Sequence, residues 1–383
     1  MQPLGIYIHY PFCLSLCPYC DFNSFVKDDT SEDAIVDKYL VELAGYKTKM
    51  LQNKQVASIY FGGGTPSLMN PKSVQKIIDF IANNFVIAPN IEITLEANPT
   101  SVENKKMQDF KQAGINRVSV GIQALNDADL QFLGRKHSAT ETIKAIELAG
   151  SIFDEFSFDL IYARHNNHKL DDWKNELKQA ISMAGNHLSL YSLTIEKGTD
   201  FFAQNIKGTL PIAKPEQSEE MYFETIDIMQ QNGFERYEIS NFAKNNKKSK
   251  HNMLYWQIHD YLGVGPGAHG RIFYKNGERI QTMTQHKTQK WLDCDELQIE
   301  QKISQQEQIC EILMMGLRIV DGIDVVDIKN RLNIDLFKNI NMDLLQKYQF
   351  MGLIKFDKTK IIPTNTGINL TNSLAKKLII KTN

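Results

Sequence analysis

Residues 7–20 read YIHYPFCLSLCPYC and hold three of the five cysteines of this 383-residue chain. Cys13, Cys17 and Cys20 follow a short β-rich run and have the spacing C-x3-C-x2-C. Five cysteines are too few for a disulfide framework in a chain of this length, so their crowding indicates metal ligation. Three thiolates on one loop can hold three corners of a [4Fe–4S] cluster and leave the fourth iron open to a small chelating molecule. A zinc site with His9 as the fourth ligand is the alternative.

Short β-rich runs alternate with longer stretches of helical period through the first 200 residues. This alternation predicts right-handed crossovers and a parallel sheet. Six such units are fewer than the eight that close a full barrel, so we expect a partial (β/α)6 TIM-like barrel. The expected strands lie at 5–10, 56–61, 91–96, 117–122, 156–161 and 187–193. The expected helices lie near 31–53, 71–85, 103–113, 139–150, 171–184 and 216–232.

The alternation weakens after residue 200, which indicates a second unit. A glycine-rich turn is expected at 263–267, helices from about residue 300, and a short hairpin at 353–362. We therefore predict three parts, of which the last is a small α+β domain of winged-helix type. The parts are a barrel at 1–235, a linking segment at 236–290 and the C-terminal domain at 291–383.

The charge balance excludes several classes of protein. Lys and Arg number 43 against 45 Asp and Glu, a net charge of −2, so no overall field attracts nucleic acid or an anionic membrane. The chain has no run of 18 apolar residues that would span a membrane, and its start lacks the charged and apolar regions of a signal peptide. These features predict a cytoplasmic protein with no nucleic-acid partner.

Unusual residues follow each of the six expected strands. In parallel α/β folds, binding sites are built at the carboxyl ends of the strands, so this coincidence predicts a ligand site there. A glycine-rich turn lets the backbone approach a ligand, and a carboxylate can bind hydroxyl or ammonium groups. After the cysteine cluster, these residues are the 62–66 turn (GGGTP), Glu96 with Asn98 and Pro99, Gln123, Asp159, and Thr194 with Glu196. Arg135 belongs to the same expected set.

The segment His251–Asn–Met–Leu–Tyr255–Trp256 is a second concentration of unusual residues. Neutral imidazole is a good axial ligand for haem iron, and Tyr and Trp can stack on a flat macrocycle. The same residues can also form an aromatic anchor that packs a loop onto the barrel, with His251 as its hydrogen-bonded end. The residues alone favour the anchor.

Several motifs together resemble the radical SAM (S-adenosylmethionine) family that includes the oxygen-independent coproporphyrinogen III dehydrogenases. The resemblance covers nearly the whole chain, and its C-terminal part resembles the domain typical of those dehydrogenases. The motifs are the 7–20 stretch, GGGTPS (62–67), LEANP (95–99), GIQ (121–123), LGRKH (133–137), YEISNFA (237–243) and YLGVGPGAH (261–269).

Three features are similar to the haem chaperone branch of this family rather than to the dehydrogenases. The dehydrogenases have a further cysteine where this chain has Phe22, and they carry an N-terminal extension for which the residues before Cys13 leave no room. The third feature is the motif HNxxYW at 251–256, proposed to bind haem in the chaperone branch. The resemblance therefore reverses the interpretation of that segment as a mere anchor.

The resemblance implies a role for each matched residue. Cys13, Cys17 and Cys20 would ligate the [4Fe–4S] cluster, and no residue is assigned a catalytic role. The residues implied for SAM are Tyr7, Tyr19, Gly63, Gly64, Thr65, Glu96, Gln123, Arg135 and Asp159, of which the last three match a second SAM site in the dehydrogenases. The residues implied for haem are His251, Asn252, Tyr255 and Trp256.

The function implied by the resemblance is that of a haem chaperone, which binds haem and transfers it to acceptor proteins. Peripheral membrane contact would then come only through those acceptors. The alternative is a radical enzyme that acts on coproporphyrinogen III, against which Phe22 and the short N-terminus argue. The chain departs from the family pattern at 163–169, where ARHNNHK replaces a Gly- and Pro-containing turn.

Overall fold

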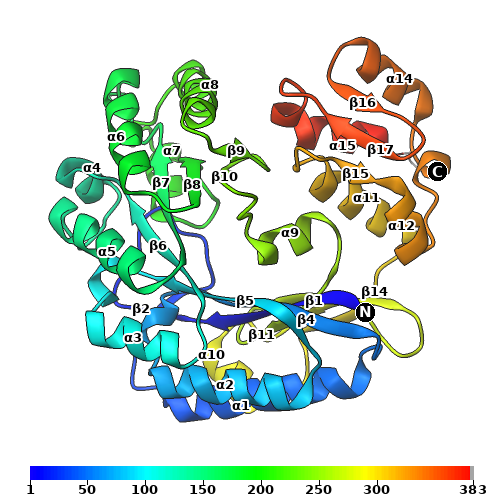
Figure 1. Ribbon diagram of the computed structural model, residues 1–383, viewed down its shortest axis with the longest axis horizontal. Helices are drawn as coiled ribbons and strands as arrows, with labels where there is room; N and C mark the ends of the chain where they lie inside the picture. Colours follow the sequence, from blue (N-terminus) through cyan, green and yellow to red (C-terminus); the bar gives the residue numbers. More distant parts are fainter. Residues whose placement is uncertain (380–383) are drawn as a thin grey trace.

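A computed structural model describes residues 1–379 of the chain. Its centre is a run of six parallel strands within a 12-stranded sheet, which curves into a partial barrel (Figure 1). The six strands are β1 (Gln2–Tyr10), β4 (Lys54–Gly63), β5 (Ile87–Ala97), β6 (Arg117–Gln123), β7 (Glu155–Tyr162) and β8 (His187–Ser192). All six expected strands and their parallel pairing are confirmed.

Helices cover the convex face of this sheet, where the apolar residues of the strands form the main core with them. The six expected helices are confirmed within a few residues of their predicted ends. They are α1 (Glu32–Lys49), α2 (Pro71–Asn84), α3 (Asn104–Gln112), α5 (Ala139–Ile152), α6 (Leu170–Met183) and α8 (Pro215–Gln231). Side chains of Ser31, Asn70 and Ser138 accept backbone N–H groups at three of the helix starts, which explains why those helices begin there. Two short helices, α4 (Asp127–Phe132) and α7 (Asp200–Ile206), were not expected.

Further strands extend the barrel sheet on both sides of the six. On one side β11 pairs in parallel with β1, which makes the predicted turn at 263–267 wrong in its first two residues. Residue 263 of β11 is a glycine because the backbone of the next strand, β12, lies very close to it. A Cβ at this position would be 2.0 Å from the carbonyl oxygen of His269. The added strands are β11 (Asp260–Val264), β12 (His269–Phe273), β13 (Arg279–Met283), β14 (Ile299–Lys302), β10 (Asn241–Ala243) and β9 (Glu235–Arg236).

Helix α9 (Lys250–Trp256) carries the HNxxYW motif and packs against β1, β4 and β11. It lies between the barrel and the C-terminal part of the chain (Figure 1). Gly5 of β1 makes room for it, because a Cβ at that position would be 3.3 Å from Leu254 and 3.4 Å from the His251 ring. The motif is therefore packed on the barrel, as the anchor interpretation expects, but as a helix rather than as the expected loop.

The C-terminal part has its own hydrophobic core, centred on Leu313, Leu345 and Ile361. The predicted hairpin at 353–362 is confirmed as the antiparallel pair of β16 and β17. The elements of the C-terminal part are α11 (Gln305–Gly316), β15 (Ile323–Asp324), α12 (Val325–Leu332), α13 (Leu336–Asn339), α14 (Met342–Phe350), β16 (Ile354–Phe356), β17 (Lys360–Pro363) and α15 (Thr371–Leu378). The predicted division of the chain at residues 235 and 290 stays a prediction. Within residues 1–379, none of the helices has the length and apolar character needed to cross a bilayer.

Candidate cofactor-binding site

The three clustered cysteines lie at one wall of a cavity of about 190 Å³ at the carboxyl ends of the barrel strands. Short strands β2 (Phe12–Cys13) and β3 (Phe25–Val26) pair with each other and anchor the loop between them. All three thiols are free and half-buried. The cavity is also lined by most of the residues expected to bind SAM: Tyr19, Gly63, Gly64, Thr65, Glu96, Gln123, Arg135 and Asp159.

Polar neighbours surround the cysteine sulfurs. The Thr65 hydroxyl donates to Cys13 Sγ over 3.5 Å, and Arg135 Nη1 donates to Cys17 Sγ over 3.3 Å. Burial raises the pKa of the Cys13 and Cys20 thiols, that of Cys20 to about 11. These thiols are therefore protonated at neutral pH, and a metal group that takes thiolate ligands must release their protons.

His9 is not available as a fourth ligand in this arrangement, which argues against the zinc alternative. Its Nδ1 is 3.0 Å from the Tyr7 hydroxyl, and its Nε2 is 2.8 Å from the carbonyl oxygen of Asn23. Both ring nitrogens are thus engaged, and burial lowers the pKa of His9 to about 4. Three cysteines without a fourth protein ligand fit a cluster with one open iron better than a closed zinc site.

The glycine turn lies directly against the strand that leads into the cysteine loop. The Gly64 N–H donates to the Tyr10 carbonyl over 2.7 Å, and the Thr65 N–H donates to the Phe12 carbonyl over 2.8 Å. A Cβ at Gly64 would be 2.5 Å from that Phe12 oxygen, and Gly63 has a φ of 109°. Only glycine meets both conditions, so the turn brings bare backbone to the cavity wall.

Two half-buried carboxylates, those of Glu96 and Asp159, face the cavity. Glu96 accepts from the Tyr60 hydroxyl over 2.7 Å and from the Gly63 N–H over 3.2 Å. Burial, together with the nearby Asp159, raises the pKa of Glu96 to about 7, and burial raises the pKa of Asp159 to about 6. Desolvated carboxylates in a cavity gain free energy when a cation binds beside them, so this wall suits the ammonium or sulfonium group of a ligand.

Tyr7 is the one expected SAM residue that does not line this cavity. Its ring lies between those of His9 and Tyr60, with centroids 5.8 and 6.2 Å away. Tyr60, which the sequence did not single out, donates to Glu96 and lines a neighbouring cavity inside the barrel. Gln123 lies on the cavity wall with a φ of 70°, a conformation rarely adopted by non-glycine residues and often found at functional sites.

A second cavity of about 320 Å³ continues from the first into the interior of the barrel. The two cavities share Tyr19, Cys20, Glu96, Gln123 and Asp159 as lining residues. Its far end reaches the start of α9, where Ser249 and Asn252 line it. A ligand beside the cysteines would therefore have a continuous path through the barrel to the helix with the HNxxYW motif.

The four residues expected to bind haem point in different directions. His251 is buried, its Nδ1 lies 2.7 Å from the Ser58 hydroxyl, and its Nε2 bonds to the Tyr255 hydroxyl. Asn252 lines the barrel cavity, whereas Trp256 lines a separate cavity of about 340 Å³ beside the C-terminal part. The four residues expected to bind haem therefore do not line a common cavity in the described part of the chain.

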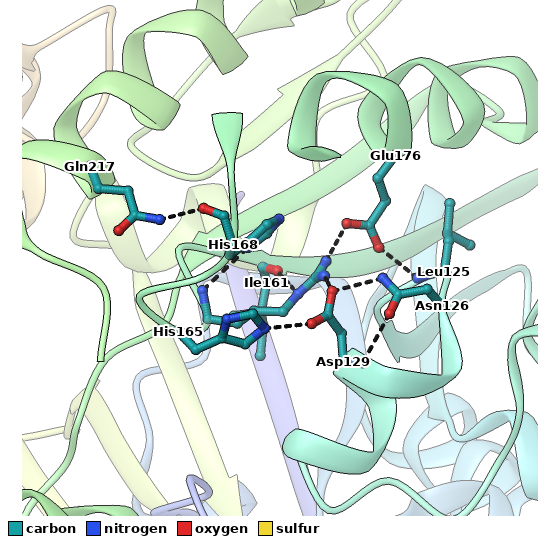
Figure 2. A network of polar contacts seen from close by, with 9 residues as sticks. Leu125, Asn126, Asp129, Ile161, His165, His168, Glu176 and Gln217 are labelled. Atoms are coloured by element: carbon teal, nitrogen blue, oxygen red, sulfur yellow. Dashed lines mark hydrogen bonds and ion pairs between the residues drawn. The ribbon is translucent and has the colours of Figure 1, made fainter. Parts of the chain in front are cut away.

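The unusual 163–169 segment forms a buried ion network, shown in Figure 2. The Arg164 guanidinium, fully buried, bonds to the carboxylates of Asp129 and Glu176, the latter over 2.5 Å. His165 Nε2 lies 2.8 Å from Asp129, and His168 Nδ1 accepts the Arg164 N–H over 3.4 Å. The two carboxylates and His168 lie close enough to hold a metal ion, but Arg164 already supplies the cation there. The segment thus ties α4 and α6 to the barrel mouth.

Several cavity residues were missed because they lie inside the barrel rather than at its mouth. They occupy alternate positions along the strands, facing inward, while the apolar residues between them face the helices. This alternation of polar and apolar residues in β6 to β8 was visible in the sequence. The missed residues are Thr94, Arg117, Ser119, Ser157, His187, Ser189 and Tyr191.

Comparison with known proteins identifies two family domains in the chain. The Radical SAM superfamily matches residues 7–175, and the HemN C-terminal domain matches residues 303–370. The chain is 38% identical to the mitochondrial radical S-adenosyl methionine domain-containing protein 1 of Mus musculus over 337 residues, which cover 83% of this chain and 74% of that protein.

Bacterial relatives match over most of their length. The chain is 31% identical to the Heme chaperone HemW of Buchnera aphidicola from Acyrthosiphon pisum, over 98% of each chain. It is 32% identical to Heme chaperone HemW of Escherichia coli K12, over 84% of each. The solved structure of the coproporphyrinogen III oxidase HemN from Escherichia coli covers 99% of this chain and 90% of its own, with a TM-score of 0.81 and 21% identity, which shows the same fold.

These relatives confirm the expected fold and cofactor class. A radical SAM scaffold uses a [4Fe–4S] cluster and SAM, and the open set of three cysteines beside a carboxylate-lined cavity fits that pair. The chain belongs to the radical SAM superfamily and, within it, to the family of the HemW proteins.

Proposed function

We propose that the protein is a haem chaperone, which binds haem and transfers it to acceptor proteins. The observation that supports this most directly is the likeness to Heme chaperone HemW over 98% of the chain, including the helix α9 that carries HNxxYW. A cytoplasmic location, and membrane contact only through acceptors, belong to the same proposal.

Cys13, Cys17 and Cys20 are the proposed ligands of the [4Fe–4S] cluster. When bound, the cluster supplies an electron donor next to the sulfonium of SAM. The part of this chain is to bind and orient SAM. Arg135 places a positive charge beside Cys17, and the glycines of the 62–64 turn let the amino-acid end of SAM approach the backbone. Glu96 and Asp159 provide the negative charges that a cationic ligand requires.

His251 is the proposed ligand of haem iron. It is neutral in the folded protein, because burial lowers its pKa to about 3, and iron requires a neutral imidazole. Its Nε2 is held by Tyr255, however, and its Nδ1 is held by Ser58. Haem ligation therefore requires one of these hydrogen bonds to break and α9 to move from its seat on the barrel.

The alternative is a radical enzyme acting on coproporphyrinogen III. The likeness to HemN supports it only at the level of fold, because the sequence identity is 21%. Phe22, which is exposed beside the cysteine loop, stands where the dehydrogenases have a further cysteine. The chaperone remains the better supported function.

The test is a haem titration followed by absorbance, with reconstituted wild-type protein and two variants. His251→Gln should lose the spectrum of ligated haem, whereas Tyr255→Phe should bind haem faster because Nε2 is no longer held. His259→Gln is the matched control, since His259 follows the motif, is half-buried, and has a pKa lowered to about 3 by desolvation. Equal haem spectra for wild type and His251→Gln would remove the ligand assignment, and turnover of coproporphyrinogen would favour the enzyme.

A further inference from the structure

The end of the barrel cavity farthest from the cysteines is lined by polar groups that lack partners. Thr94 Oγ1 and His187 Nδ1 are buried and have no hydrogen-bond partner within the described part of the chain. Both residues line the 320 Å³ cavity, together with Arg117. A buried polar atom without a partner costs free energy, so two of them at one end of one cavity indicate a ligand that supplies the missing bonds.

Arg117 is a buried cation with a weak countercharge. Its ion pair with Glu92 spans 3.7 Å, which is beyond hydrogen-bonding distance. The oxygens of Glu92 already accept the N–H groups of Lys250 and His251 at the start of α9, each over 3.2 Å. The guanidinium is thus positioned at the cavity wall with hydrogen-bonding capacity left over, and it offers five donors in a planar fork.

His187 can act as a second donor. Its Nε2 lies 2.8 Å from the Tyr237 hydroxyl, which accepts the Ser249 N–H over 3.3 Å. That hydroxyl is free to give its own proton to Nε2, which leaves the proton of the neutral ring on Nδ1. Burial and the charge of Arg117 lower the pKa of His187 well below its ordinary value, so the ring is neutral.

The three side chains come from β5, β6 and β8, and β7 lies between the last two of these strands. Thr94 of β5 is in register with Arg117 of β6, and His187 of β8 is in register with Ser157 of β7. Ser157 is in turn in register with Ser119 of β6, and Ser119 with Glu96 of β5. His187 and Glu96 therefore share a row two residues farther along the sheet than Thr94 and Arg117. Asp159 lies two residues beyond that row. The cavity therefore has a hydroxyl and a cation in one row, His187 with Glu96 in the next row, and Asp159 beyond them.

We propose that Thr94, Arg117 and His187 form a carboxylate-binding site, here called the barrel-floor site. A carboxylate has two oxygens with about four acceptor positions, which can satisfy a guanidinium, a hydroxyl and an N–H group together. The carboxylate can be a propionate of a tetrapyrrole, in which case the site rests on the proposed function, or part of a small free acid. Either source gives the same contacts.

The test compares Thr94→Val with Thr142→Val. Thr142 also has a buried hydroxyl without a partner among the described residues, but it lies in α5 and does not line the cavity. Removing an unsatisfied hydroxyl should leave both ligand-free variants at least as heat-stable as wild type. Only Thr94→Val should bind a carboxylate ligand more weakly, by about tenfold. A double variant, Arg117→Met with Glu92→Gln, keeps the charge balance and should lose more affinity for the carboxylate ligand than Thr94→Val does.

The probes are protoporphyrin IX with free propionates, its dimethyl ester, and succinate, each titrated into the full chain. Wild type and Thr142→Val should prefer the free acid over the ester, and the barrel-floor variants should lose that preference. Equal binding of acid and ester by wild type, or an unchanged preference in Thr94→Val, would overturn the site. If no porphyrin binds but succinate raises the melting temperature of wild type and not of the Arg117 variant, the site stands and the haem function fails. If neither binds, both fail.

Discussion

Replacing Arg164 by methionine should destabilise the protein strongly, because the buried Arg164 guanidinium pairs with two buried carboxylates (Figure 2). Methionine keeps much of the volume but leaves Asp129 and Glu176 facing each other without their countercharge. Removing one partner of a buried ion pair typically costs about 3–5 kcal/mol. The Nε–H donation to the Ile161 carbonyl is lost as well, which leaves that oxygen without its side-chain donor.

The cost should depend on pH in a defined direction. Burial raises the pKa of Asp129, but Arg164, Asn126 and His165 outweigh it and hold the pKa at about 2, below its unfolded value. A carboxylate with a lowered pKa stabilises the fold above its unfolded pKa, and this contribution is lost as the pH falls from about 4 toward 2. The difference between wild type and Arg164→Met should therefore be largest at neutral pH and shrink below about pH 4.

The assay is urea unfolding at pH 7.5 and pH 3.5, followed by circular dichroism. Lys174→Met is the control: it lies on the same helix α6 and breaks the more exposed pair with Glu224, which is worth about 0–1 kcal/mol. Adding Asp129→Asn and Glu176→Gln to Arg164→Met should recover at least about 2 kcal/mol, because no unpaired charge is left. A cost below that of Lys174→Met, or no recovery in the triple variant, would refute the reasoning.

Two further predictions concern the cofactor site. Anaerobically reconstituted wild type should show broad visible absorbance, and Cys17→Ala should lose it. Cys294→Ala, which changes a cysteine outside the cluster loop, should keep this absorbance. Unchanged absorbance in Cys17→Ala would contradict the cluster assignment. Glu96 has a pKa raised to about 7 by burial, so it ionises as the pH rises from 6 to 8, and SAM should bind reconstituted protein more tightly at pH 8. Glu96→Gln should weaken SAM binding by about tenfold in calorimetry and flatten this pH dependence; a pH dependence equal to that of wild type would rule out Glu96 as its source.

The sequence predicted the barrel because its strands and helices alternate with distinct periods. It did not predict β11, because a run with Gly263 and Gly265 resembles a turn, and glycine is disfavoured in strands. The reason for Gly263 is the close backbone of β12, a contact between segments that no local pattern reveals. The short helix α9 was missed for a similar reason, since its position depends on the room left by Gly5 of β1.

The candidate site divides in the same way. Residues at the strand ends, such as Glu96 and Gln123, were predicted because a parallel sheet brings all its carboxyl ends to one edge. The barrel-floor residues were not, because the spatial relation of Thr94, Arg117 and His187 follows only when the register of the four strands β5 to β8 is known. The anchor interpretation of HNxxYW anticipated a hydrogen-bonded His251, but the sequence did not identify its partners, Ser58 and Tyr255.

The position of α9 couples two parts of the molecule. On the barrel side, Glu92 accepts the first N–H groups of α9. On the side of the C-terminal part, Arg318 lies 4.6 Å from the centre of the Trp256 ring. Arg331 donates to the carbonyls of Gln257 and Ile258, which follow the end of α9. A displacement of α9 would thus change its contacts with the barrel and with the C-terminal part. If haem binds through His251 as proposed, a partner that binds the C-terminal part and favours one position of α9 will change the affinity for haem, and haem will change the affinity for that partner by the same factor. The loading of haem and its delivery to a partner would then depend on the same equilibrium between positions of α9.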